Sequence, residues 1–150
     1  TLVAKFDRTG LREDLPTGDA VLMSVTGALQ RGESFAGYDS VTVIPDAEAP
    51  YTAGHDPAPN PEKKFPVDTN ITVHVRDDGF GVDMSTIVMT VNDTAVSPVI
   101  TGDTYDYTLV YDPPMDFGYG KAVNVTIDAT DRARPRNVMA TDAYSFTTEA

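Results

Sequence analysis

The residues best suited to chemistry in this chain are five aspartates that fall at or beside expected turns. Ca²⁺ takes roughly six to eight oxygen ligands, many of them carboxylates and backbone carbonyls from flexible loops. Gly79 and Gly81 lie among these aspartates and would let backbone carbonyls turn towards a shared ion. The sequence therefore predicts a calcium site formed by Asp77, Asp78, Asp83, Asp103 and Asp131.

A second interpretation of the same aspartates needs no metal. Their spacing is not that of an EF-hand, because no glutamate closes a twelve-residue loop. Aspartate is also common in turns, where its side chain accepts hydrogen bonds from nearby backbone N–H groups. Both interpretations stay open at the level of sequence.

Another acidic segment lies next to aromatic residues. Asp112 and Asp116 stand beside Tyr111, Phe117 and Tyr119. Such a loop could hold a sugar by ring stacking and carboxylate hydrogen bonds, whereas tyrosines near strand ends also serve as packing residues in β-sandwiches. The absence of tryptophan from the chain favours the packing interpretation.

Catalytic chemistry finds little support in the sequence. His55 lies in a proline-rich stretch, and His74 alternates with valines, which places it on the outer face of a strand. Neither position suggests a histidine next to a nucleophile. The chain has no cysteine, so it has no disulfide, thiolate zinc site or cysteine nucleophile. We expect no enzyme activity and no cofactor beyond the candidate calcium ion.

Charge and hydropathy exclude two classes of partner. The formal net charge is −12 and the isoelectric point is near 4.3, which repels nucleic acid backbones. No apolar run approaches the roughly 18 residues of a membrane span. We therefore expect neither nucleic-acid binding nor membrane insertion.

Alternation of apolar and polar residues predicts β-strands over most of the second part of the chain. Turns rich in Asp, Gly and Pro separate the strands. Seven short antiparallel strands at this spacing predict an all-β fold, an immunoglobulin-like sandwich in which the loops after the first, third and fifth core strands meet at one pole. The strands are expected near 49–53 and at 69–76, 84–92, 95–100, 105–111, 121–129 and 140–148.

The first 66 residues divide into two further parts. Residues 1–46 are β-rich, with strands expected at 2–6, 21–26 and 40–44, a helical turn at 9–15 and a hairpin at 29–35 around Gly32. This is little for an independent core, so we interpret it as the C-terminal end of a preceding β domain. Residues 47–66 are rich in proline and predict a linker that contains a first edge strand. The sandwich itself is expected at 67–150.

Several segments resemble bacterial immunoglobulin-like modules, also similar to fibronectin type III domains, that are repeated in secreted and cell-surface proteins. The resemblance is carried by 68–83, with its I-x-V-x-V-x-D sequence, and by 91–93, 123–131 and 144–148. The chain departs from the pattern at Phe80, where serine is usual, and at 132–137, where the last loop is longer.

The resemblance implies an extracellular or cell-surface location and a structural role. We expect a non-catalytic module that acts as a spacer, adhesion or assembly domain of a larger protein. Its expected partners are neighbouring domains, other copies that pair through β-edges, and surface glycans. The alternative is a carbohydrate-binding accessory module of a glycan-degrading enzyme.

Overall fold

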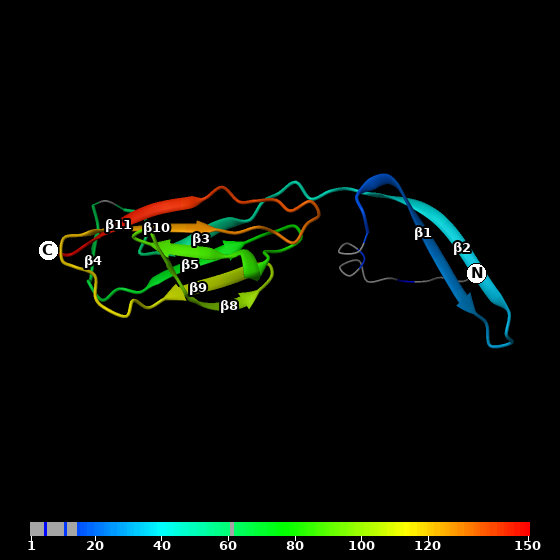
Figure 1. The fold of residues 1–150 in the computed structure, drawn as a ribbon, viewed down its shortest axis with the longest axis horizontal. Helices are drawn as coiled ribbons and strands as arrows, with labels where there is room; N and C mark the ends of the chain where they lie inside the picture. The colour runs from blue at the N-terminus through cyan, green and yellow to red at the C-terminus, as the bar shows by residue number, and fades with distance from the viewer. Residues whose placement is uncertain (1–4, 6–10, 12–14, 61) are drawn as a thin grey trace. The chain divides into compact units, whose positions relative to one another are not determined.

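The computed structural model describes residues 5, 11, 15–60 and 62–150. The chain divides into two compact units, Thr1–Asp46 and Ala47–Ala150 (Figure 1). No helix in the described ranges has the length and apolar character needed to cross a membrane. The strand expected at 2–6 and most of the helical turn expected at 9–15 lie outside the described residues.

The first unit contains a long antiparallel hairpin. Strand β1 (Gly18–Ala28) pairs with β2 (Ser34–Val43), and the turn between them is closed by a hydrogen bond from the N–H of Leu29 to the carbonyl of Glu33 (2.7 Å). The separate strand expected at 40–44 is part of β2. None of the described residues in this unit is buried.

The second unit is an all-β sandwich of two sheets. One sheet has the order β4-β11-β10-β6-β7 and the other the order β3-β5-β9-β8. All neighbours are antiparallel except β4 and β11, which are parallel. The strands are β3 (Tyr51–Asp56), β4 (Lys64–Phe65), β5 (Ile71–Arg76), β6 (Val88–Val91), β7 (Thr94–Val96), β8 (Val99–Asp103), β9 (Asp106–Tyr111), β10 (Ala122–Asp128) and β11 (Asp142–Thr148), with a 3₁₀ turn η1 (Met84–Thr86) before β6.

The hydrophobic core lies between the two sheets. Alternate residues of the central strands point inward and are buried, while their neighbours face outward. Phe146 packs edge-on against both Phe65 and Phe117, with ring centroids 5.7 and 5.8 Å apart. The innermost aliphatic residues include Ile71, Val73, Val75, Leu109, Val123, Val125 and Ile127.

Two expected boundaries differ from the structure. The strand expected at 95–100 is divided between β7 and β8, which belong to different sheets. Pro98 lies between them and has no N–H for a ladder hydrogen bond. Most of the segment predicted as a linker, 47–66, belongs to the sandwich: β3 fits between Pro50 and Pro57, and β4 follows just before Pro66.

Gly102 provides a test of the β8–β9 turn. Its φ is +110°, and a Cβ there would collide with the backbone carbonyl of Asp106. We expect Gly102→Ala to destabilise the sandwich by about 2–4 kcal/mol, which combines left-handed strain with the backbone collision. Urea unfolding followed by tyrosine fluorescence measures the loss.

Gly120→Ala is the matched control for this substitution. Gly120 also has a positive φ (+63°), but its Cβ would have no atom within 4 Å. Only the conformational strain of roughly 1–2 kcal/mol should appear there. Equal losses for the two variants would contradict the collision at Gly102.

Candidate functional site

Three loops meet at one pole of the sandwich and carry the five aspartates predicted as calcium ligands. The N–H of Val82 donates to the carbonyl of Thr104 (2.7 Å), and the N–H of Arg132 donates to the carbonyl of Gly81 (2.9 Å). The loop after β5, the β8–β9 turn and the loop between β10 and β11 are thereby joined. We call these residues, 77–83, 103–105 and 129–137, the loop pole.

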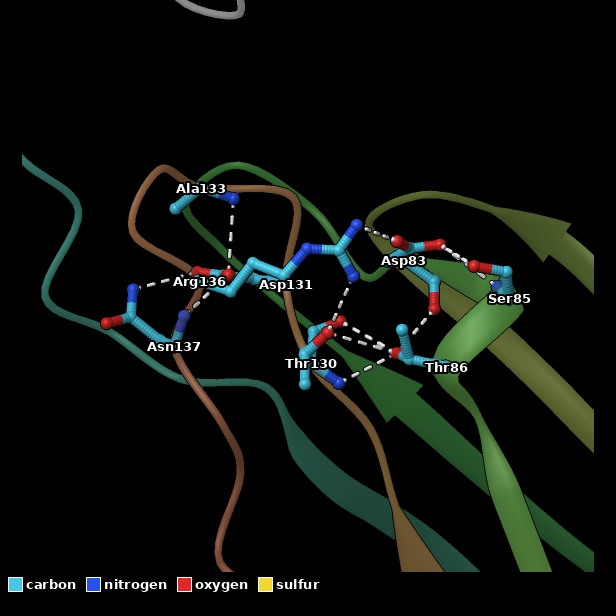
Figure 2. Close-up of polar contacts among 8 residues, drawn as sticks. All are labelled: Asp83, Ser85, Thr86, Thr130, Asp131, Ala133, Arg136 and Asn137. Carbon is cyan, nitrogen blue, oxygen red and sulfur yellow. Dashed lines mark hydrogen bonds and ion pairs between the residues drawn. The ribbon is translucent and has the colours of Figure 1, made fainter. Parts of the chain in front are cut away.

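Asp131 organises the longest of these loops from inside. Its side chain has no exposed surface. Asp131 Oδ1 accepts hydrogen bonds from the N–H of Ala133 (3.2 Å) and of Asn137 (2.8 Å), and Oδ2 accepts from Asn137 Nδ2 (2.8 Å), as Figure 2 shows. The carboxylate thus replaces the sheet partners that these backbone groups lack.

Asp77 has the same role in the loop after β5. It is 1% exposed, and its Oδ1 accepts from the N–H of Gly79 (2.9 Å) and of Gly81 (2.7 Å). The N–H of Asp77 in turn donates to the carbonyl of Tyr105 (3.2 Å). The residue fixes the loop locally and attaches it to the β8–β9 turn.

Asp83 connects the 3₁₀ turn to the long loop. Its Oδ1 accepts from the N–H and the hydroxyl of Ser85 (3.0 and 2.6 Å), and its Oδ2 lies 2.7 Å from Arg136 Nη2. The hydrogen bond from the Ser85 hydroxyl, with a further contribution from Arg136, lowers the pKa of Asp83 below its ordinary value. Arg136 Nη1 also donates to the hydroxyl of Thr130 (3.3 Å) (Figure 2).

The remaining two aspartates lie at the surface of the loop pole. Asp78 Oδ2 accepts from the hydroxyl of Tyr51 (3.3 Å). Asp103 Oδ1 accepts from the N–H of Tyr105 (2.9 Å), as in an ordinary aspartate turn. Each of the five carboxylates therefore accepts hydrogen bonds within the chain.

The structure brings the predicted calcium ligands to one pole but gives them other partners. Within the described ranges, no group of three or more His, Cys, Asp or Glu residues is arranged to hold a metal ion. Asp77 and Asp131 direct oxygens to backbone N–H groups of their own loops, and Asp83 faces a guanidinium. Calcium binding stays a prediction, and the hydrogen bonds account for the aspartates without it.

Sequence reasoning missed two histidine–aspartate pairs. His55 Nε2 lies 2.7 Å from Asp142 Oδ2, which also accepts from the hydroxyl of Thr52 (2.8 Å), so β3 and β11 are joined by side chains across the two sheets. The ring of His55 contacts Tyr144 edge-on at 4.7 Å. Burial raises the pKa of the Tyr144 phenol, and Asp142 adds to the effect.

The second pair lies on the outer face of the β3-β5-β9-β8 sheet. His74 Nδ1 lies 2.7 Å from Asp106 Oδ1, and Arg76 Nη2 lies 2.8 Å from Asp106 Oδ2. The hydrogen bond with His74, followed by that with Arg76, lowers the pKa of Asp106. Thr108 Oγ1 lies 3.4 Å from the same Nδ1 atom. The cluster is a cross-strand polar network on a half-exposed surface.

The aromatic and acidic loop does not form a sugar platform of stacked rings. Phe117 is packed on the core against Phe146, and its N–H donates to the carbonyl of Val67 (2.8 Å). Tyr111 also packs against the core. Tyr119, which is 65% exposed, and the exposed carboxylates Asp112 and Asp116 remain on the surface.

Comparison with known proteins gives no match: no family model fits the chain, and neither a curated protein nor a solved structure is similar to it. The function is therefore argued from geometry.

Asp131 provides a test of the hydrogen-bonded loop pole. We expect Asp131→Ala to lower the free energy of unfolding by about 2–4 kcal/mol, because it leaves backbone and amide donors without an acceptor. Urea unfolding by circular dichroism measures this. Asp103→Ala, at an exposed aspartate with one backbone donor, should cost under about 1 kcal/mol; a comparable loss at both positions would argue against a special role for Asp131.

The lowered pKa of Asp83 predicts a stability that depends on acid pH. The unfolded state, with an ordinary aspartate pKa near about 3.9, binds protons before the native carboxylate does. The contribution is present above that value and is lost as pH falls through the lower pKa of folded Asp83. Removing the hydroxyl in Ser85→Ala should therefore cost stability at pH 7 and progressively less below about pH 4.

Urea unfolding at pH 7, 5, 4 and 3 measures this dependence. Ser145→Ala is the control, because Ser145 lies on the outer face of β11, away from Asp83. A difference between Ser85→Ala and the unmodified chain that stays constant with pH would refute the linkage.

Proposed function

We propose that this chain is a non-catalytic structural module built on an immunoglobulin-like sandwich, and that it spaces or presents neighbouring domains of a secreted or cell-surface protein. The strand orders support the immunoglobulin-like assignment. Counted along the sandwich, β3-β5-β9-β8 corresponds to strands A-B-E-D, and β4-β11-β10-β6-β7 to A′-G-F-C-C′.

The observation that carries the spacer role is the direction of the strands at the two ends of the sandwich. β4 runs parallel to β11, with Lys64 opposite Thr147 and Phe65 opposite Thr148. The polypeptide therefore enters at one pole and leaves at the other (Figure 1). Tension applied through the chain acts along these strands, so that several hydrogen bonds are loaded in shear at once.

The C-terminal attachment of this shear-loaded pair is reinforced by a buried side chain. Thr148 has no exposed surface. Its hydroxyl donates to the carbonyl of Gly118 (2.6 Å) and accepts from the N–H of Lys121 (2.9 Å). The N–H of Glu149 donates to the carbonyl of Phe65 (2.8 Å). The last strand is thus held on both sides.

The histidine geometry supports a non-catalytic role. A Ser-His-Asp arrangement uses one imidazole nitrogen for the nucleophile and the other for the carboxylate. In this chain Thr108 and Asp106 contact the same nitrogen of His74, and Thr52 contacts Asp142 in place of His55. Neither cluster has the order of a nucleophilic triad.

A carbohydrate-binding accessory module remains the second candidate, and one observation favours it. On the outer sheet face, Asp106 holds His74 and Arg76 in place, and Tyr51, 43% exposed, stands on the neighbouring strand β3. Fixed polar groups next to an aromatic ring suit a sugar. This face, in place of the loop at 111–119, is where such a ligand would bind.

Mechanical unfolding tests the spacer role. Tandem copies of the full chain, pulled end to end by atomic force microscopy, should give one cooperative force peak per sandwich with a gain of about 30 nm in contour length. Thr148→Val should lower the unfolding force, because it removes the hydroxyl that fixes β11. Thr147→Val, the same change at the outward-facing neighbour, should leave the force unchanged.

The direction of pulling is the second control. With cysteines introduced by Lys64→Cys and Ala95→Cys, force acts across the sheet from β4 to β7 and separates hydrogen bonds one after another. We expect a lower force than in end-to-end pulling. Equal forces in the two directions, or extension without peaks, would remove the observation on which the spacer proposal stands.

Affinity gel electrophoresis distinguishes the second candidate. A spacer should migrate alike in gels with and without polysaccharides such as cellulose derivatives, xylan and mannan. Retardation that is lost in Arg76→Ala and kept in Ser145→Ala would instead support sugar binding on the outer sheet face.

A further inference from the structure

The hairpin of the first unit lacks what a stable β-structure needs. A two-stranded ribbon is marginally stable in water, and three or more strands with an apolar face are usually required. None of the described residues of this unit is buried, although one face of the ribbon carries the apolar side chains Val21, Met23, Val25, Phe35, Val41 and Val43 (Figure 1). Both strands also have an outer edge that no named strand covers.

The two edges differ in how they are protected. β2 has a charged residue near its middle, Asp39, and Pro45 follows its end. Charges and prolines are the usual means of preventing edge-to-edge pairing. β1 has neither between Ala20 and Ala28, and its single charge, Asp19, lies at its start. The β1 edge is therefore the one open to strand addition.

We propose that β1 pairs with β1 of a second copy of this chain, in an antiparallel arrangement about a two-fold axis near Met23 and Ser24. This makes a four-stranded sheet from two hairpins and gives the assembly role of the proposed module a physical form, so it rests on that function for its meaning. The source of the partner is the chain itself, because the sequence of β1 is complementary to its own reverse.

The complementarity is visible in the register centred on Met23. Antiparallel residues directly opposite each other point to the same side of a sheet. Val21 then faces Val25 of the second copy, and the two Met23 residues face each other, so that the apolar faces are continuous. Asp19 faces Gly27, and the two Asp19 carboxylates lie at opposite ends of the pair.

Self-pairing of β2 would be unfavourable for the same geometric reason. A two-fold arrangement centred on β2 brings the two Asp39 residues opposite or diagonal to each other. Like charges at such positions destabilise a sheet. The choice of β1 over β2 is thus determined by where the acidic residues lie.

Analytical ultracentrifugation of the full chain tests the proposal. The 16.1 kDa chain should approach twice that mass with increasing concentration. Because each copy carries a net charge of −12, association should strengthen when salt is raised from about 0.05 to 0.5 M. Ser24→Lys places like charges across the two-fold axis and should weaken dimerisation at least tenfold. Ser40→Lys, on the same face of β2, should leave it unchanged.

Crosslinking tests the position of the axis. The chain has no cysteine, so Ser24→Cys introduces a unique thiol close to its counterpart, and mild oxidation should give a covalent dimer. Ser40→Cys should not, because three strand spacings of about 4.8 Å separate the two thiols, beyond the reach of a disulfide.

A chain that stays monomeric up to about 1 mM, or a dimer that both lysine variants weaken equally, would overturn self-pairing through β1 and indicate a different partner for the hairpin. Force peaks of the sandwich would be unaffected by that result. Loss of those peaks with dimerisation intact would instead count against the spacer role alone.

Discussion

The contact between β5 and β10 across the middle of the sandwich is the constraint on which the rest of the structure depends. Each strand buries every second residue completely, and the two rows pack against each other from opposite sheets. A shift of one residue in either strand would turn its apolar row outward. The strict alternation of these rows therefore determines which residues face solvent on their neighbours, including the histidine and arginine on the outer side of β5.

The ends of the sheets impose a second constraint. Loops that pass over the end of the core are partly buried, and their backbone N–H groups have no ladder partner. Asp77 and Asp131 meet this need with carboxylates that are themselves buried. Part of the acidic character of the chain is thus used inside the fold, where it orders the loops, and only the remainder contributes to the charge of the surface.

The sequence allowed a good prediction wherever local periodicity decides the structure. The expected strands at 69–76, 105–111, 121–129 and 140–148 correspond to β5, β9, β10 and β11 within about two residues. Periodicity does not show where a chain changes sheets, so the passage around Pro98 was missed. It also says nothing of side chains that meet from distant positions, such as Asp83 with Arg136 or His55 with Asp142. The aspartate–glycine spacing at 77–79 was the available signal for a hydrogen-bonded turn.

The pairing of β4 with β11 has a consequence for how the molecule is made. These strands come from the beginning and the end of the sandwich, so the fold cannot close before the last strand has been synthesised. At about 5–20 residues per second, a ribosome leaves the apolar rows of β5 uncovered for several seconds. During that interval the nascent chains are kept apart by their mutual repulsion, and a strongly negative polypeptide is protected from aggregation before it has any structure of its own.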